Sequence, residues 1–189
     1  YLRREPHCVL RLTVAKAEIL SDLRVTVDSD SDHGINRSQS CAYVCLSGPK
    51  GTSIPLEYAT KRQHFGANST AWAELIAAHL AIRVSLKVAM MLGDLVPDTQ
   101  EPGIRLRVDN TSGKTILQTG HSSKLAIAQA CTKIRLAFSR DCFRHGILGI
   151  DYVNTKLNRA NLGTKPLAKP EFQRERQQMQ IVAPIREAT

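Results

Sequence analysis

The sequence predicts an α/β domain with a five-stranded mixed sheet, in which three antiparallel strands are followed by parallel additions, flanked by helices. Three neighbouring strand-like segments lie in the first third of the chain, and the first of them alternates apolar and polar residues, which is typical of a half-buried strand. Two later strand-like segments each follow a long helical pattern, and such a helix allows a parallel crossover. A length of 189 residues is enough for one domain with its own core.

The three antiparallel strands are expected at residues 23–30, 40–47 and 52–60. The first alternates valine with polar side chains, and a Gly-Pro-Lys-Gly turn at 48–51 joins the second to the third. Pro55 in the third strand indicates an irregular or edge position, because proline has no amide hydrogen for the ladder. Short connections between the three strands favour an antiparallel meander.

A long helix is expected to begin at a cap formed by Ser69 or Thr70 and to end near Leu92, with Gly93 as its stop. The later elements are expected as a strand at 104–108, a short helix at 110–119, a second long helix at 126–143, a strand at 148–153 and a short helical segment near 158–162. Helical spacing predicts two buried stripes, formed by Leu75, His79, Ile82 and Leu86 and by Ile127, Ala130, Ile134 and Phe138.

We divide the chain into a lead-in at 1–22, a principal domain at 23–167 and a charged tail at 168–189 that is expected to be helical. The first residue is not methionine, which suggests a fragment of a longer polyprotein. The tail is predicted to be a solvated helix with ion pairs within it. The side chains for these pairs are Glu171, Arg174, Glu175 and Arg176.

The composition indicates a reducing compartment and a polyanionic partner. The formal net charge is +9 and the sequence pI is about 9.6, which suits nucleic acid. The cysteines are odd in number and form no CxxC pair, which argues against a zinc ribbon or a disulfide scaffold and predicts an intracellular location. They are Cys8, Cys41, Cys45, Cys131 and Cys142. No uninterrupted apolar run approaches the roughly 18 residues of a membrane span, so no membrane association is expected.

Three carboxylates occupy positions from which a fold could bring them together. Asp30 ends the first strand, Glu74 lies near the start of the long helix, and Asp109 ends the strand at 104–108. Hard divalent cations prefer oxygen ligands, and phosphate chemistry commonly uses such sites. Asp28 and Asp32 are alternatives to Asp30, and strand alternation puts Asp28 on the same face as Asp30.

Short stretches distributed along the chain resemble, in the same order, those of one family. They are Tyr1-Leu2-Arg3, Ser29-Asp30-Ser31-Asp32-His33, Arg37-Ser38-Gln39-Ser40, Lys61-Arg62-Gln63, Ser69 to Leu75, Val108-Asp109-Asn110, Val153-Asn154-Thr155-Lys156 and Ala160 to Leu167. The family is the ribonuclease H domain of copia-type retrotransposon polyproteins. The resemblance implies the RNase H-like fold for the principal domain and the end of a reverse-transcriptase connection for the lead-in.

The resemblance also implies the site. Asp30, Glu74 and Asp109 match the family's catalytic, metal-binding carboxylates, and Asn161 stands where the family has a fourth acid. Two ions are expected, Mg²⁺ or Mn²⁺, and no small-molecule cofactor. An amide oxygen can bind a metal but brings no negative charge, so the second ion should bind more weakly.

The implied activity is metal-dependent endonucleolytic hydrolysis of the RNA strand of RNA·DNA hybrids during retrotransposon reverse transcription. The implied partners are the hybrid and the reverse-transcriptase domain of the same polyprotein, in a cytoplasmic particle or the nucleus. Phosphate contacts are expected from Lys61, Arg62 and Lys114, with Asn110 near a 2′-hydroxyl group.

An alternative is a weakened or inactive RNase H-like module, from a domesticated or decaying element, that acts in nucleic-acid or protein binding. Asn161 favours it. So do two other departures from the family, Leu125-Ala126-Ile127 in place of His-Ile-Asp, and Trp72 in place of Glu. An integrase or transposase would need a late-helix glutamate, and residues 126–143 contain none.

Overall fold

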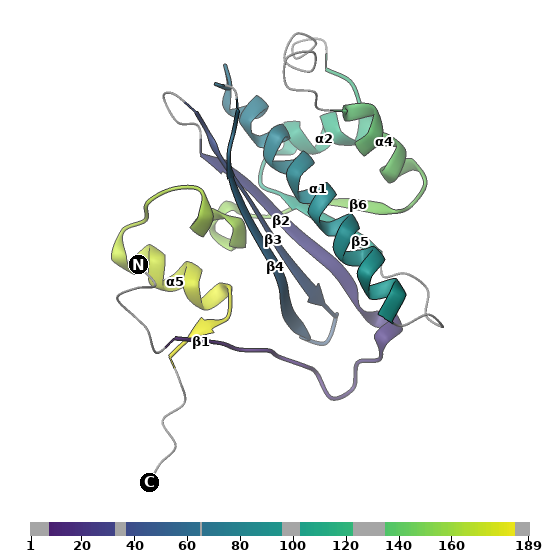
Figure 1. The fold of residues 1–189 in the computed structure, drawn as a ribbon, viewed down its shortest axis with the longest axis vertical. Coiled ribbons are helices and arrows are strands. Elements are labelled where there is room, and N and C mark those ends of the chain that lie inside the picture. The colour runs from purple at the N-terminus through teal and green to yellow at the C-terminus, as the bar shows by residue number, and fades with distance from the viewer. Residues whose placement is uncertain (1–7, 33–36, 65, 96–102, 123–134, 184–189) are drawn as a thin grey trace.

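A five-stranded mixed sheet forms the centre of the computed structural model, which describes residues 8–32, 37–64, 66–95, 103–122 and 135–183 (Figure 1). The strands are β2 (Arg24–Asp32), β3 (Gln39–Ser47), β4 (Ser53–Arg62), β5 (Ile104–Val108) and β6 (Leu148–Tyr152). Their order is β4-β3-β2-β5-β6, with antiparallel β2–β3 and β3–β4 pairs and parallel β2–β5 and β5–β6 pairs. The predicted fold class is confirmed.

Pro55 lies in β4, which is an edge strand, and the register between β3 and β4 shifts between Val44 and Cys45, opposite this proline. The edge position leaves the missing amide hydrogen of proline without consequence for the ladder. The prediction of an irregular edge strand is therefore confirmed.

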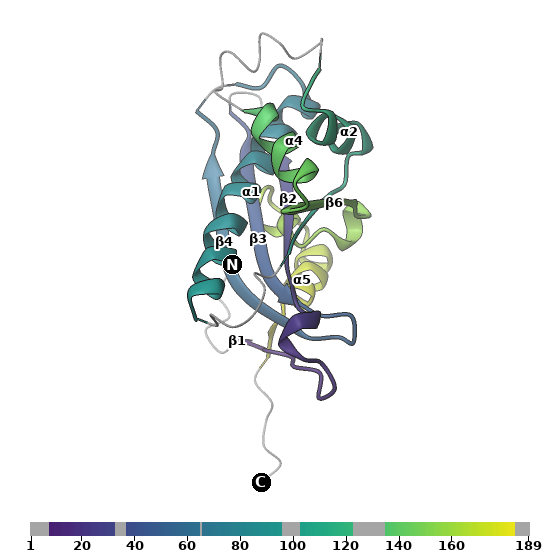
Figure 2. The same ribbon diagram turned by 90° about the vertical axis from the view of Figure 1, so that its right-hand side faces the viewer.

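Helices cover both faces of the sheet (Figures 1 and 2). The helices on one face are α1 (Thr70–Leu95), α2 (Thr111–Thr119) and α4 (Leu136–Arg144). On the other face lie the 3₁₀ helix η5 (Arg159–Gly163) and the helix α5 (Lys169–Gln178). Two further 3₁₀ turns are η2 (Leu20–Asp22) and η4 (Thr155–Leu157). Alternation along β2 explains the division, because Val25 and Val27 face the apolar core, whereas Asp28 lies on the opposite face and contacts η5.

The apolar core is centred on α1 and the strands beneath it. Val27, Leu106 and Ile82 are completely buried, and Leu75 is nearly so. By length and apolarity, α1 is also the one described helix that could cross a membrane, a property the sequence reading did not anticipate. Its packing on β2 and β3 accounts for that apolarity, since core helices of globular domains have the same composition.

The ends and faces of the long helices differ in part from prediction. Ser69 caps α1 as predicted, its hydroxyl accepting from the backbone N–H of Trp72 at 3.2 Å. The helix does not stop at Gly93 but continues to Leu95, because Leu92 still packs against the core and holds the last turn helical. Of the predicted stripe, Leu75 and Ile82 are buried, whereas His79 and Leu86 are only half-buried.

The second long helix is described only as α4, and the predicted part at 126–134 lies outside the described residues. The predicted stripe is wrong at Phe138, which is 39% exposed. The buried side chains of α4 are instead Leu136, Ser139 and Cys142, so the helix is rotated relative to the expected phase. Apolar residues on both sides of such a short helix make the phase ambiguous from sequence.

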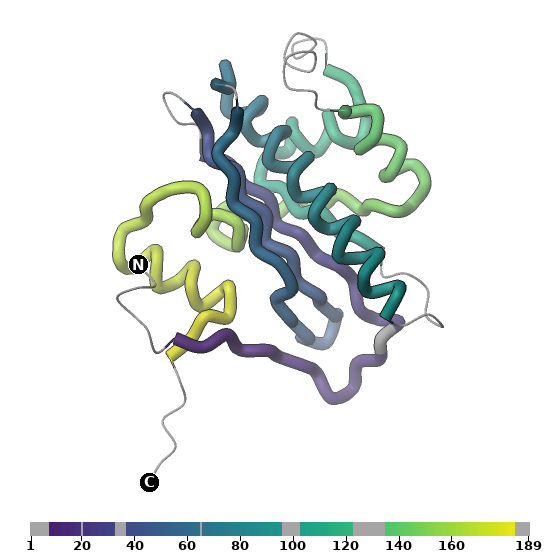
Figure 3. The backbone as a smooth tube through the Cα atoms, viewed as in Figure 1, coloured from purple at the N-terminus to yellow at the C-terminus, as the bar shows by residue number. Residues whose placement is uncertain are grey.

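The two ends of the described chain meet. Strand β1 (Val9–Leu10) pairs antiparallel with β7 (Ile181–Val182), and an isolated bridge joins Thr13 to Ser53 of β4 (Figure 3). The lead-in and the tail thus form a small second sheet against the principal one. The proposed boundaries at 22/23 and 167/168 remain predictions.

The predicted tail contains the helix α5, and most of its side chains are exposed as expected, but one position is buried. Glu175 of α5 is only 2% exposed, and Met179, just after the helix, packs with Tyr43 and Cys45 of β3. The ion pair given for this helix joins the adjacent residues Arg174 and Glu175 at 3.2 Å. The helix α5 contacts η5 and β7, and neither neighbour can be inferred from the tail sequence itself.

Candidate active site

Strand register brings two of the three predicted acids to one edge of the sheet. Asp28 of β2 lies opposite Arg107 of β5 in the parallel pair, so Asp30 and Asp109, each two residues further on, come to the same end of their strands. Glu74 reaches them from the start of α1. One carboxylate oxygen from each of Asp30, Glu74 and Asp109 lies within 4.8 Å of the others.

A buried glutamine links the start of α1 to the sheet. The side-chain nitrogen of Gln63 donates to the hydroxyl of Ser40 on β3 at 2.8 Å and to the carbonyl of Ala73 at 3.0 Å. Ala73 directly precedes Glu74, so these bonds fix the backbone that carries the carboxylate. Gln63 belongs to a stretch that the resemblance singled out, although its positioning role was not foreseen.

Burial and mutual repulsion disfavour three negative charges here. Burial, and after it the negative charges of Asp30 and Asp109, raises the pKa of Glu74 to about 8. Burial raises the pKa of Asp30 to about 6 against the opposing hydrogen bond from Thr164, while the charge of Asp109 adds to the rise. Such a set of close oxygen donors fits a divalent cation, which would relieve the repulsion.

The choice between Asp28 and Asp30 depends on two arginines. Asp28 is fully buried and binds Arg107 through two bonds, from Nε at 2.5 Å and from Nη2 at 2.6 Å. Nε of Arg159 donates to the same carboxylate at 2.9 Å. The carboxylate of Asp28 is therefore engaged in ion pairs with these two arginines. Asp32, at the end of the strand, is not a member of the carboxylate cluster.

The amide of Asn161 is engaged with the backbone. Its nitrogen donates to the carbonyl of Thr155 at 2.5 Å, and its oxygen is buried without a hydrogen-bond partner among the residues that the structure describes. The residue directly after η5 reaches the acids, because the hydroxyl of Thr164 donates to Asp30 at 2.6 Å. The positive charge of Lys165 also acts on Asp30 and Glu74, opposing the rise of both pKa values.

Thr164 and Lys165 are the site residues that sequence reasoning missed. The available signal was their place in the closing Thr-Lys-Pro-Leu stretch, three and four residues after Asn161. The sequence alone could not show that the chain directly after η5 would bring the Thr164 hydroxyl to Asp30 and the charge of Lys165 near Asp30 and Glu74.

The predicted phosphate contacts lie at the acidic end of the sheet. Asp30 pairs with Cys41, and Cys41 pairs with Thr60, so Lys61 and Arg62 follow at this end of β4. Both are exposed, two strands or roughly 10 Å from β2. The structure thus leaves both cations accessible beside the carboxylates.

On the other side of the acids, Asn110 caps α2, because its side-chain oxygen accepts from the N–H of Gly113 at 3.1 Å. That bond leaves the amide nitrogen as the group for an external contact. Lys114 is half-buried one turn into α2. Both residues lie close in sequence to Asp109, and their contact with nucleic acid remains a prediction.

Comparison with solved structures identifies the fold as that of ribonuclease H. LC11-RNase H1, solved in complex with an RNA/DNA hybrid, is 16% identical, with 75% of this chain and 94% of that chain covered at a TM-score of 0.50. RNase H1 of the archaeon Halobacterium salinarum NRC-1 is 18% identical, with coverage of 75% and 94% and a TM-score of 0.48.

The native protease–reverse transcriptase of prototype foamy virus is also similar, at 12% identity and a TM-score of 0.43. That match covers 92% of this chain and 23% of the viral protein. No model of a protein family matches this chain, and neither does any curated protein. The copia-type assignment therefore remains a prediction from the sequence.

Proposed function

We propose that this chain is a metal-dependent ribonuclease H-type endonuclease that hydrolyses the RNA strand of RNA·DNA hybrids. One observation carries the proposal: on a ribonuclease H fold, Asp30, Glu74 and Asp109 bring their oxygens within 4.8 Å of one another. Desolvation and mutual repulsion make this arrangement unfavourable without a cation, so a purely structural role gives no reason for it.

In this proposal, Asp30, Glu74 and Asp109 hold two ions, Mg²⁺ or Mn²⁺, with Asn161 at the fourth position. Such ions supply Lewis-acid stabilisation of the scissile phosphate and lower the pKa of the attacking water. Thr164 orients Asp30 through its hydrogen bond, which fixes one ligand oxygen. In the absence of ions, Lys165 offsets part of the negative charge of Asp30 and Glu74.

Hybrid recognition follows from the groups beside the acids. Lys61 and Arg62 at the end of β4, and Lys114 on α2, contact the phosphate backbone from the two sides of the carboxylates. The amide nitrogen of Asn110, whose side-chain oxygen accepts from Gly113, contacts a 2′-hydroxyl, the group that distinguishes RNA from DNA. The net charge of +9 favours such a polyanionic substrate.

We place this activity in retrotransposon reverse transcription, with the reverse-transcriptase domain of the same polyprotein as partner and a cytoplasmic particle or the nucleus as location. The support is the copia-type resemblance, including Tyr1-Leu2-Arg3 and the closing stretch from Ala160 to Leu167. Residues 1–7 lie outside the described residues, so this part of the proposal depends on sequence.

The direct test is cleavage of a labelled RNA annealed to DNA. We expect the purified protein with Mg²⁺ or Mn²⁺ to cut the RNA of the hybrid and to spare single-stranded RNA. Asp109→Asn should reduce the rate by on the order of a thousandfold, because one charged ligand is lost. Asp141→Asn, which changes an exposed aspartate of α4, is the matched control and should leave the rate within about twofold. Cutting that survives Asp109→Asn would identify a contaminating nuclease.

The second candidate function, a binding module without catalysis, is favoured by the neutral Asn161 and its bond to Thr155. Hybrid binding by a protein that cuts nothing at any Mg²⁺ or Mn²⁺ concentration would establish this alternative.

Asn161→Asp separates the two candidates further. The new carboxylate is expected to shift the Mg²⁺ dependence of cutting to lower concentration by restoring the missing charge. The metal-free protein should lose about 1–3 kcal/mol of stability, because the nitrogen that donates to Thr155 is gone. A Mg²⁺ titration of the initial rate and urea denaturation in EDTA measure the two effects. An unchanged Mg²⁺ midpoint would remove residue 161 from the metal site.

A further inference from the structure

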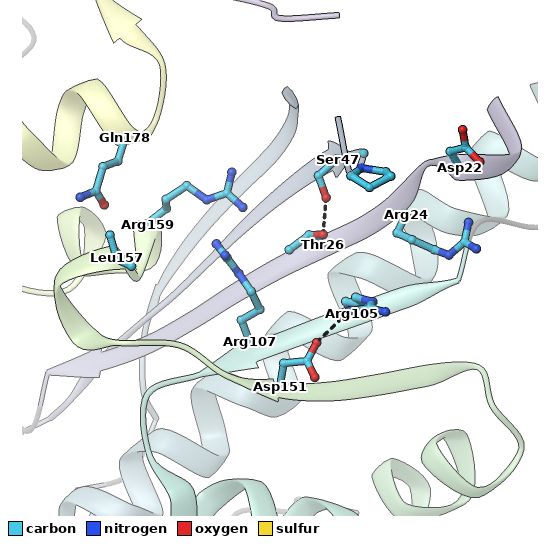
Figure 4. Close-up of a pocket in the computed structure, with 12 residues that line it drawn as sticks. Asp22, Arg24, Thr26, Ser47, Arg105, Arg107, Asp151, Leu157, Arg159 and Gln178 are labelled. Carbon is cyan, nitrogen blue, oxygen red and sulfur yellow. Dashed lines mark hydrogen bonds and ion pairs between the residues drawn. The ribbon is translucent and has the colours of Figure 1, made fainter. Parts of the chain in front are cut away.

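An arginine-lined cavity of about 810 Å³ lies on the sheet face opposite α1 (Figure 4). Its arginines come from three elements: Arg24 from β2, Arg105 and Arg107 from β5, and Arg159 from η5. Strand alternation brings them together, since residues 24, 26 and 28 share one face of β2 and residues 105 and 107 share the adjacent face of β5. The cavity is well within the size range of small-molecule sites.

Two of these arginines are held rigidly by the buried Asp28. Nε and Nη2 of Arg107 donate hydrogen bonds to that carboxylate, and Nη1 of Arg107 has no hydrogen-bond partner among the described residues. Arg159 gives Nε to Asp28, and its guanidinium lies 4.8 Å from the centroid of the Tyr43 ring. One carboxylate thus fixes two cations, and a fixed guanidinium loses little entropy when it binds a ligand.

The other two arginines lie at the opposite end of the cavity. Nη1 of Arg24 donates to the carbonyls of Ser21 and Leu23 at 2.7 Å each, which holds the guanidinium by neutral acceptors. Nη1 of Arg105 lies 3.3 Å from Oδ2 of Asp151, and both side chains are exposed. An incoming anion can therefore compete with Asp151 for Arg105, because such exposed ion pairs are weak. Four arginines against three aspartates (Asp22, Asp28 and Asp151) leave one positive charge in excess.

We propose that this cavity binds a phosphate-bearing ligand, either a free polyphosphate or the phosphodiester backbone of a single-stranded nucleic acid. The planar fork of arginine matches phosphate oxygens in a bidentate manner. The cavity is separate from the acids, because Arg24 and Asp30 lie near opposite ends of β2. The proposal therefore does not depend on catalysis.

The test measures binding in EDTA, where the carboxylate cluster repels anions and does not contribute. Inorganic pyrophosphate is titrated by calorimetry, and a fluorescein-labelled single-stranded DNA 10-mer by anisotropy. The double variant Arg24→Gln/Arg105→Gln removes two exposed charges and leaves the buried Asp28 pairs intact. We expect its affinity for either ligand to fall by at least about tenfold. Arg83→Gln/Arg140→Gln, outside the cavity, is the charge-matched control and should stay within about twofold.

A second variant, Asp151→Asn, removes the competing carboxylate and is expected to raise the affinity severalfold. Whichever ligand binds more tightly identifies the source of the phosphate. Three outcomes would overturn the proposal: no binding of either ligand, equal losses in the two double variants, or binding of a hexaglutamate peptide with the same arginine dependence while both phosphate ligands fail. Melting curves verify that each variant is folded before titration.

Discussion

Glu74→Gln is expected to abolish hybrid cutting and, in the same protein, to raise the stability of the metal-free form at pH 8. The carboxylate of Glu74 lies against Asp30 and Asp109, and burial together with their charges raises its pKa to about 8. Glutamine keeps the shape and removes the repulsion. The expected gain is on the order of 2–4 kcal/mol at pH 8, and the expected loss of rate is on the order of a thousandfold.

The sign of the pH dependence follows from proton binding. In the unfolded chain Glu74 loses its proton near pH 4.5, whereas in the folded protein it keeps the proton to about pH 8. Between these values the folded state binds more protons, so the contribution of Glu74 to stability falls as pH rises. The stability difference between Glu74→Gln and the unchanged protein should be near zero at pH 4.5 and largest at pH 8 and above.

Urea denaturation in EDTA from pH 4.5 to pH 8.5 measures this difference, and added Mg²⁺ should stabilise the unchanged protein more than the variant. Glu57→Gln, a carboxylate of β4 outside the cluster, is the control and should show no such pH-dependent gain. If Glu74→Gln loses activity and also loses metal-free stability, the carboxylate has a structural role and the metal-site proposal fails.

Asp28→Asn is expected to destabilise the protein by about 3–5 kcal/mol, because it leaves the guanidinium groups of Arg107 and Arg159 without their shared countercharge. Asp151→Asn, which breaks the exposed pair with Arg105, should cost less than about 1 kcal/mol. Urea denaturation at pH 7 compares the two variants directly.

The Asp28→Asn variant also tests whether Asp28 or Asp30 is the metal ligand. At a temperature where Asp28→Asn remains folded, hybrid cutting should persist, whereas Asp30→Asn should abolish it. The reverse result would make Asp28 the metal ligand and would overturn the assignment to Asp30.

Local pattern was enough to predict most of the sheet. The alternation of apolar and polar residues in β2 and in β5 is a property of a few consecutive residues, and burial of one face of the sheet determines it. The predicted strand at 104–108 coincides with β5. The face of α4 could not be predicted in the same way, because Phe138 and Leu136 are both apolar and only the packed neighbours decide which is buried.

The sequence by itself determined the fold class, the edge position of Pro55 and the three acids that meet in space, since period, turn residues and ordered motifs are encoded locally. Only the tertiary structure decided that Asp28 binds two arginines, that Thr164 contacts Asp30, that Asn161 binds a backbone carbonyl, and that Glu175 is buried. The physical reason is distance along the chain. Asp28 and Arg159 are 131 residues apart, and Asp30 and Thr164 are 134 apart. No local pattern specifies contacts at such separations, whereas the packing of η5 on β2 makes them directly.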